Sequence, residues 1–138
     1  LGDVYKRQVQ NSMFQYLIGN TDFSVAYQHN GKLLYIDKKI YPLPYDFDLC
    51  GLVDASYAIV NSKLGIKSVK DRKYRGFKRE ESLVEEVRDQ ILSKKGDLFQ
   101  IVDSQKTKFE IPSEFESTRE YLTKFFDKVS EQSYVTSS

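Results

Sequence analysis

The sequence is poor in the features that mark several specialised classes of protein. Its single cysteine, Cys50, excludes an internal disulfide framework and is interpreted as a small buried residue. Its single histidine, His29, has no histidine or cysteine partner at zinc-ligand spacing, so we interpret it as a residue that orients its loop. No apolar run approaches the roughly 18 residues of a membrane span. A formal net charge of +1 implies no global field for nucleic acid or membranes.

What is present is enough for one folded domain. The chain has 138 residues, of which 40% are hydrophobic and 14% aromatic, so a substantial core can form. No internal repeat and no second domain are visible in it. We expect the domain to occupy residues 9–132 and a polar tail to occupy residues 133–138.

The first eight residues are predicted to be foreign to the protein. Residues 3–8, DVYKRQ, resemble the frame translation of a transposon-end adapter used in sequencing libraries. We therefore exclude residues 1–8 from fold reasoning, as for any fusion scar. Without them the charge becomes formally neutral, because two of 21 basic and one of 20 acidic residues are removed. This origin implies that the natural N-terminus is missing.

The first half of the chain predicts a helix, a polar loop and a pair of strands. Residues 9–18 carry apolar side chains at helical spacing, and Gly19 follows at the position of a helix C-cap. Their predicted buried face is Val9, Met13, Phe14, Leu17 and Ile18. Residues 20–30 are turn-rich and polar. Residues 32–36 and 40–45 read as strands around a turn at 37–39, and two prolines make the second an edge or irregular strand.

The second half predicts a long irregular segment and then helices. Residues 49–74 are loop-like, and residues 67–79 are strongly basic. A helix opens at residues 80–82 and carries apolar residues at the helical period up to residue 92, with a possible break at Gly96. Ser113 and Glu116 have the spacing of a capping box for a final helix. Its predicted buried face is Phe115, Tyr121, Leu122, Phe125, Phe126 and Val129.

Polar residues gather on both sides of the predicted hairpin. Asn20, Thr21 and Asp22 with His29 and Asn30 precede it, and Asp46 and Asp48 follow it. Folding the hairpin could therefore bring carboxylates and an amide together, which outlines a metal and phosphate site. Any one of these residues alone is more often a turn former.

The order of these elements resembles the C-terminal lobe of a protein-kinase-like fold, and the fold class expected is mainly helical α+β with a small β-hairpin. Residues 14–22 (FQYLIGNTD), 29–30 (HN), 42–48 (PLPYDFD) and 51–53 (GLV) look like those of a distant relative of the CotH spore-coat kinases, an atypical kinase-like family. The resemblance covers most of the chain after residue 8. It implies a nucleotide partner and a protein or small-molecule phosphate acceptor.

The resemblance also implies roles for four residues. Asp22 stands in the place of the catalytic base, while Asn30 and Asp46 stand in the places of the metal ligands, with Mg²⁺ or Mn²⁺ and ATP as cofactors. Asp48, where an ordinary protein kinase has glycine, is a further candidate ligand, because alternation in an extended segment puts Asp46 and Asp48 on one face. Which of the two holds the metal stays open, although Asp46 directly follows the strand.

Several alternatives stand beside this interpretation. The basic run at 67–79 is typical of a solvated surface, but Arg72 or Arg75 could bind phosphate or an acidic substrate. The chain could be a catalytically dead kinase-like scaffold, or a metal-dependent phosphoester hydrolase that uses Asp22, Asp46 and Asp48. A kinase takes its phosphate-binding lysine and glycine-rich loop from the N-terminal lobe, so we predict that this fragment alone is inactive.

Overall fold

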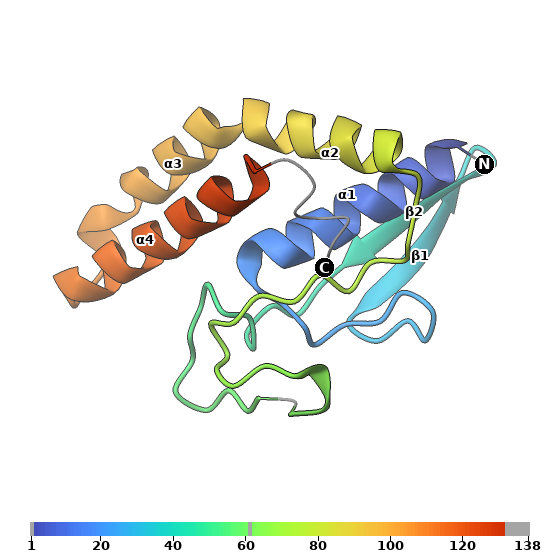
Figure 1. The fold of residues 1–138 in the computed structure, drawn as a ribbon. Helices are drawn as coiled ribbons and strands as arrows, with labels where there is room; N and C mark the ends of the chain where they lie inside the picture. The colour runs from blue at the N-terminus through green and yellow to red at the C-terminus, as the bar shows by residue number, and fades with distance from the viewer. Residues whose placement is uncertain (1, 61, 132–138) are drawn as a thin grey trace.

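The chain combines four α-helices with one two-stranded antiparallel sheet in a computed structural model that describes residues 2–60 and 62–131 (Figure 1). The α+β class predicted from the sequence is confirmed. None of the helices in the described residues combines the length and apolarity of a membrane span. The polar tail predicted at residues 133–138 lies outside the described part of the chain. The elements in order are α1 Gly2–Ile18, β1 Gly31–Ile36, β2 Lys39–Pro44, α2 Glu81–Ser93, α3 Lys95–Ser104 and α4 Pro112–Val129.

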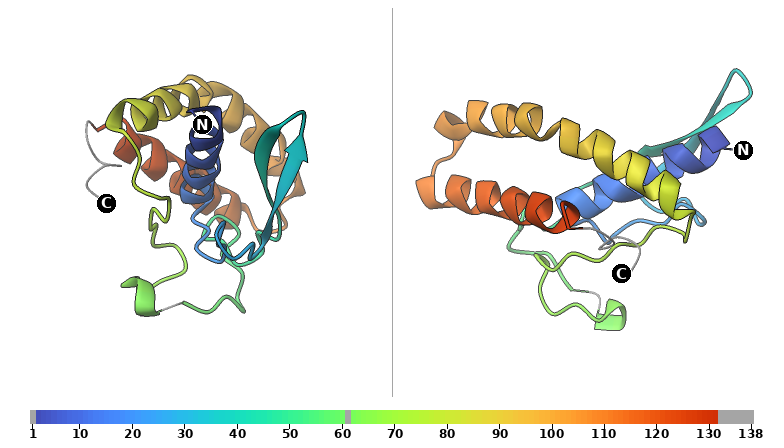
Figure 2. Two further views of the ribbon diagram at one scale, coloured as in Figure 1. Left: turned by 90° about the vertical axis from the view of Figure 1, so that its right-hand side faces the viewer. Right: turned by 45° about the horizontal axis from the view of Figure 1, so that its top comes forward.

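Helix α1 lies at the centre of the fold, with α2, α4 and the hairpin around it (Figure 2). Met13, Tyr16 and Leu17 repeat at helical spacing and are buried, as the pattern at 9–18 predicts for Met13 and Leu17. Phe14 was expected on the same face, but that is wrong, since its side chain is 40% exposed. It lies about a quarter turn from Met13, off the buried stripe. The helix runs through residues 2–8, whose adapter origin stays a prediction.

The hairpin forms where the sequence predicts it, within one residue at each end. Asp37 and Lys38 have positive φ angles of 49° and 64°, which is the conformation of a two-residue type I′ turn. Ile36 pairs with Lys39 beside this turn, and Pro42 and Pro44 pair with Leu33 and Gly31. Because hydrogen-bonded and non-hydrogen-bonded pairs alternate along the ladder, both prolines fall on non-hydrogen-bonded pairs, where β1 needs no N–H from them.

The second half of the chain contains three helices, of which α2 and α4 pack on α1 and α3 packs on α2 and α4. Helices α2 and α3 follow one another with a break at Lys94, and α4 runs back beside α3 (Figure 1). The break comes two residues before Gly96, which lies inside α3. All six residues predicted on the buried face of α4 are buried there.

The capping box predicted at the start of α4 is wrong. The N-cap residue is Ile111, no side chain caps the helix, and Ser113 lies within the first turn. Pro112 occupies the start of the helix instead, because its fixed φ suits that position and its missing N–H has no partner to lose there.

We expect Gly96→Ala to raise the free energy of unfolding by about 0.5 kcal/mol, because alanine loses less backbone entropy than glycine when a helix forms. A Cβ at this position meets no atom within 4 Å, and Gly96 is exposed. Urea unfolding followed by circular dichroism at 222 nm measures the change. If Gly96→Ala is less stable than the natural chain, the prediction that a Cβ is accommodated at this position is wrong.

Candidate functional site

The loop after α1 is fixed by Asn20, which lies two residues before the candidate base Asp22. Gly19 ends the helix with a φ of 68°, a left-handed conformation that suits glycine. Asn20 is buried, donates its amide to Gln15 Oε1 at 2.8 Å and accepts the Asp22 N–H at 3.1 Å. The sequence placed Asn20 among the polar residues of the loop, but its burial and its hold on Asp22 follow only from the fold.

The carboxylate of Asp22 contacts His29 and Asn30, the two residues expected near it. His29 Nε2 lies 2.8 Å from Asp22 Oδ1. The Asn30 amide donates to Asp22 Oδ2 at 3.0 Å and to the Asp22 main-chain oxygen at 2.8 Å. The His29 contact agrees with its interpretation as a residue that orients the loop. Among the described residues, Asn30 Oδ1 accepts no hydrogen bond, so this oxygen is available to a ligand.

The hairpin returns the chain to this loop. Tyr45 N–H donates to the Asn30 main-chain oxygen at 3.1 Å, just after β2 ends. The next residue, Asp46, is exposed and has a positive φ of 61°, so the chain turns sharply as it leaves the strand. Folding of the hairpin thus brings Asp46 toward the loop that carries Asp22, as the sequence predicts.

Asp46 and Asp48 form a close pair of exposed carboxylates. The hydrogen bond that protonated Asp46 donates to the Asp48 carboxylate, together with the negative charge of Asp48, raises the pKa of Asp46, and the charge of Asp22 adds a smaller effect in the same direction. The Tyr57 hydroxyl donates to Asp48 Oδ2 at 3.3 Å. The charge of Asp48 raises the pKa of Tyr57. These shifts show that the carboxylates share one electrostatic environment.

The segment after Asp46 is attached to the core and to α1. Phe47 packs edge-to-face on Phe14, with 5.9 Å between ring centroids. Cys50 is 1% exposed, which confirms its interpretation as a small buried residue. Gly51 N–H donates to Gly19 O at 3.0 Å and Leu52 N–H donates to Ile18 O at 2.9 Å. These two main-chain hydrogen bonds therefore hold the segment that follows Asp46 and Asp48 against the C-terminal end of α1, where the Asp22 loop begins.

The two arginines considered as phosphate ligands both bind main-chain carbonyl groups. Arg72 donates to Tyr16 O, Leu17 O and Tyr121 O at 2.7 to 3.3 Å, and its guanidinium lies 3.7 Å from the centre of the Tyr121 ring. Arg75 Nη1 donates to Thr21 O at 2.6 Å and Phe23 O at 3.0 Å. The structure thus gives both residues partners within the protein, and phosphate binding by either stays a prediction.

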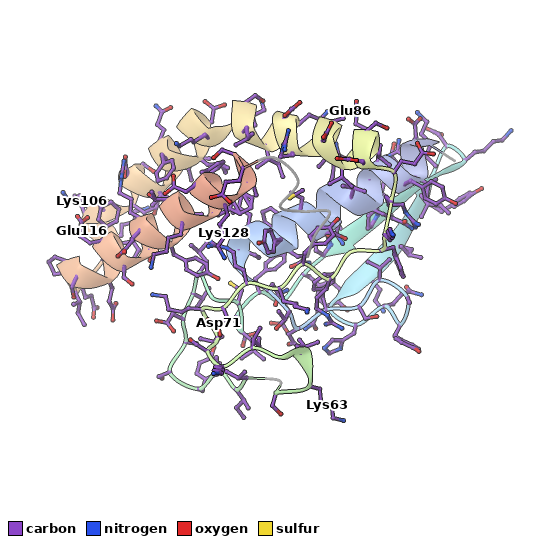
Figure 3. All side chains as sticks on the ribbon, viewed as in Figure 1. Lys63, Asp71, Glu86, Lys106, Glu116 and Lys128 are labelled. Carbon is purple, nitrogen blue, oxygen red and sulfur yellow. The ribbon has the colours of Figure 1, made fainter. Side chains whose placement is uncertain are left out.

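Asp71 shapes the chain just before Arg72 (Figure 3). Its carboxylate accepts the N–H groups of Lys67 and Ser68 at 2.9 and 3.1 Å, and these bonds lower the pKa of Asp71. The predicted loop at residues 49–74 is confirmed over its described parts, residues 49–60 and 62–74, apart from a 3-10 turn at Ser62–Leu64.

The described residues can offer a metal ion a small set of oxygen ligands. They contain no group of three or more histidine, cysteine, aspartate or glutamate side chains arranged to hold a metal. The available set is the Asp46–Asp48 pair with Asn30 Oδ1. Magnesium and manganese sites often use one or two carboxylates together with phosphate oxygens and water, so these oxygen donors are of the type that such an ion takes, and metal binding here stays a prediction.

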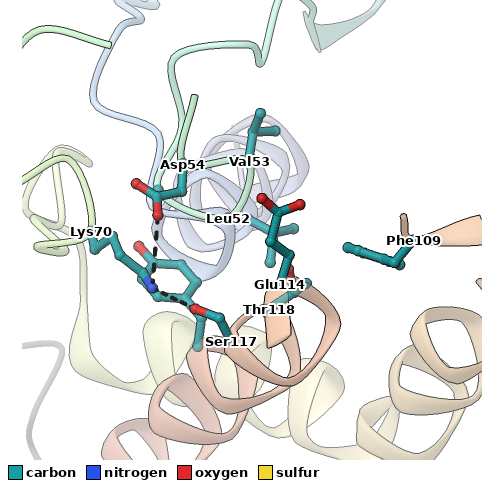
Figure 4. Close-up of a pocket in the computed structure, with 10 residues that line it drawn as sticks. Leu52, Val53, Asp54, Lys70, Phe109, Glu114, Ser117 and Thr118 are labelled. Carbon is teal, nitrogen blue, oxygen red and sulfur yellow. Dashed lines mark hydrogen bonds and ion pairs between the residues drawn. The ribbon is translucent and has the colours of Figure 1, made fainter. Parts of the chain in front are cut away.

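A separate pocket of about 140 Å³ lies between the segment after Cys50 and α4 (Figure 4). Lys70 Nζ donates to Ser117 Oγ at 2.9 Å and lies 4.0 Å from Asp54 Oδ2. Glu114, Thr118 and Phe109 also line the pocket. None of the site residues predicted from the sequence lines it. Residues 51–53 of the GLV stretch also line it, but no motif in the sequence marks Lys70, Ser117 or Thr118, which come from distant parts of the chain.

Comparison with family models, curated proteins and solved structures found no match to this chain.

Proposed function

We propose that this chain is the C-terminal catalytic lobe of an atypical, metal- and ATP-dependent kinase-like phosphotransferase. Asp22 is the catalytic base, and Asn30 with Asp46 and Asp48 holds Mg²⁺ or Mn²⁺. One observation carries the proposal: the Asn30 amide binds both the carboxylate and the main-chain oxygen of Asp22, while the residue before Asp46 bonds to the Asn30 carbonyl. Base and metal ligands are thus linked through one asparagine.

The geometry assigns a task to each side chain. His29 and Asn30 hold the Asp22 carboxylate in one orientation, which suits a group that accepts the proton of an acceptor hydroxyl. The Asn30 NH₂ group donates its hydrogen bonds to Asp22, which leaves the Asn30 Oδ1 atom as the one that can bind a metal ion. When bound, the metal ion would neutralise the charge of phosphate oxygens. Phosphoryl transfer relies mostly on such positioning and electrostatic stabilisation.

The pKa of Asp46 predicts how metal binding depends on pH. A metal ion needs the ionised carboxylate, and the pKa of Asp46 lies above the ordinary value. Affinity for the ion should therefore fall as the pH is lowered through this raised pKa, at a higher pH than for an isolated aspartate. Mn²⁺ titrations at several pH values, followed by water-proton relaxation, measure this dependence.

The experiment that tests the proposal measures Mn²⁺ binding to the chain with ATP present. We expect Asp46→Asn to weaken Mn²⁺ binding about tenfold, which corresponds to about 1.4 kcal/mol. Asp37→Asn is the matched control, because Asp37 is an exposed aspartate with positive φ in the turn of the hairpin. The same titration by electron paramagnetic resonance is carried out on four proteins: the natural chain, Asp46→Asn, Asp48→Asn and Asp37→Asn. If the natural chain, Asp46→Asn and Asp48→Asn bind Mn²⁺ equally strongly, the proposed metal site is wrong.

One observation favours a second candidate function, a metal-dependent phosphoester hydrolase. The charges of both Asp22 and Asp48 raise the pKa of Asp46, so Asp46 lies close enough to feel both of the other carboxylates. Against it, these carboxylates do not form a three-ligand metal group. Metal-dependent hydrolysis of p-nitrophenyl phosphate without nucleotide would favour the hydrolase. A scaffold protein with this fold would show neither nucleotide-linked metal binding nor hydrolysis.

A further inference from the structure

Arg75 donates hydrogen bonds to the main chain on both sides of Asp22. Its Nη1 atom donates to the carbonyl oxygen of Thr21 at 2.6 Å and to that of Phe23 at 3.0 Å. These two residues directly precede and follow Asp22 in the sequence. The guanidinium also lies 5.8 Å from the centre of the Phe23 ring, which is 6% exposed. One charged nitrogen therefore holds two carbonyl groups that bracket the candidate base.

The other hydrogen bonds that hold Asp22 come from its own loop. Asn20, His29 and Asn30 lie within eight residues of it. Arg75 lies more than fifty residues further along the chain, in the basic segment 67–79. Hydrogen bonds from a charged donor are roughly twice as strong as neutral ones, so this contact can fix the loop relative to the rest of the fold. Arg72, three residues earlier, attaches the same segment to the last turn of α1.

We propose that Arg75 is a positioning residue for Asp22. The basic segment, through this single guanidinium, sets the place of the loop that presents the Asp22 carboxylate. The inference rests on the proposed function only in treating Asp22 as the base. The contact itself can be tested without metal or nucleotide. This role differs from the phosphate binding that the sequence suggested for Arg75, because the ligand of the guanidinium is the protein's own main chain.

His29 supplies a spectroscopic probe of the contact. It is the only histidine in the chain, so its ring gives a single set of nitrogen signals. Asp22 accepts a hydrogen bond from His29 Nε2, which favours the tautomer with the proton on Nε2. Asp22→Asn removes the charged acceptor and gives the reference spectrum for a broken contact. The long-range ¹H–¹⁵N spectrum of the imidazole therefore reports where Asp22 lies.

We expect the His29 spectrum of Arg75→Gln to move most of the way toward that of Asp22→Asn. Lys73→Gln is the matched control, because Lys73 is an exposed cation of the same segment, and its spectrum should coincide with that of the natural chain. Dispersed signals from the aromatic core establish that each variant is folded. A folded Arg75→Gln protein with the natural His29 spectrum would overturn the proposal.

Arg75→Lys decides the matter if the glutamine variant does not fold. Lysine keeps the charge but lacks the planar guanidinium, so we expect the His29 spectrum to move part of the way and the fold to survive. An unchanged spectrum in that case would also overturn the proposal. Because no metal is present, this result stands apart from the Mn²⁺ titration. Failure of metal binding would reject the proposed function and leave the role of Arg75 intact.

Discussion

Replacing Arg72 by methionine is expected to lower the free energy of unfolding by about 3 kcal/mol, since hydrogen bonds to a charged group contribute about 1.5–3 kcal/mol each and Arg72 makes several. Its Nε and Nη2 atoms donate to carbonyl groups at the end of α1 and to Tyr121 O in α4. Its guanidinium also stacks on the Tyr121 ring. Methionine keeps the apolar stem and removes the donors. Partial solvent access to this half-buried residue keeps the expected loss below the sum of the individual bonds.

Urea unfolding at 25 °C measures this change, and Lys73→Met is the matched control. Lys73 is the next residue and is exposed, so its replacement should change the free energy of unfolding by no more than about 0.5 kcal/mol. The same pair of variants distinguishes two roles for Arg72. A phosphate ligand without a structural role would leave stability unchanged in Arg72→Met and weaken phosphate binding instead.

Gly51→Ala is expected to cost about 3 kcal/mol of unfolding free energy, the upper end of the usual range for an overpacked site. An added Cβ would overlap the Tyr121 hydroxyl and would lie 2.7 Å from the Val69 main-chain oxygen. Gly51 also donates its N–H to Gly19 O, so the backbone cannot move away without losing that bond. The close packing of Gly51 against Tyr121 of α4 and the Val69 main chain therefore requires a residue without a side chain.

Tyr121→Phe removes one of the three close contacts of that Cβ, the contact with the hydroxyl oxygen. The Tyr121 hydroxyl is buried without a hydrogen-bond partner among the described residues, and burial raises the pKa of Tyr121 to about 12. Removing it alone should be nearly neutral, because no hydrogen bond is lost. Combined with Gly51→Ala it should recover only part of the loss, because the ring carbon Cζ of residue 121, at 2.8 Å, and the Val69 oxygen, at 2.7 Å, remain in contact with the Cβ. A double variant no more stable than Gly51→Ala would show that the hydroxyl is not the obstacle.

Local features of the fold could be predicted well from the sequence. The spacing of Phe115, Tyr121 and Phe125 identified the buried face of α4, because side chains three or four residues apart share one side of a helix. The turn at Asp37 and Lys38 was equally readable. The prediction was wrong where two local signals competed, as at Pro112 and Ser113, and where helical spacing alone could not set the edge of a buried stripe, as at Phe14.

The sequence by itself determined the hairpin, because short-range periodicity and turn chemistry act within a few residues, and its resemblance to a kinase-like family selected Asp22, Asn30 and Asp46 as candidates. Only the tertiary structure decided that Arg72 and Arg75 bind main-chain carbonyl groups and that Gly51 lies against Gly19. These contacts join residues more than thirty positions apart. The local sequence around an arginine in a basic run is the same whether its side chain faces solvent or binds the end of a helix. The physical reason is that a hydrogen-bond partner is chosen by position in space, which local sequence does not encode.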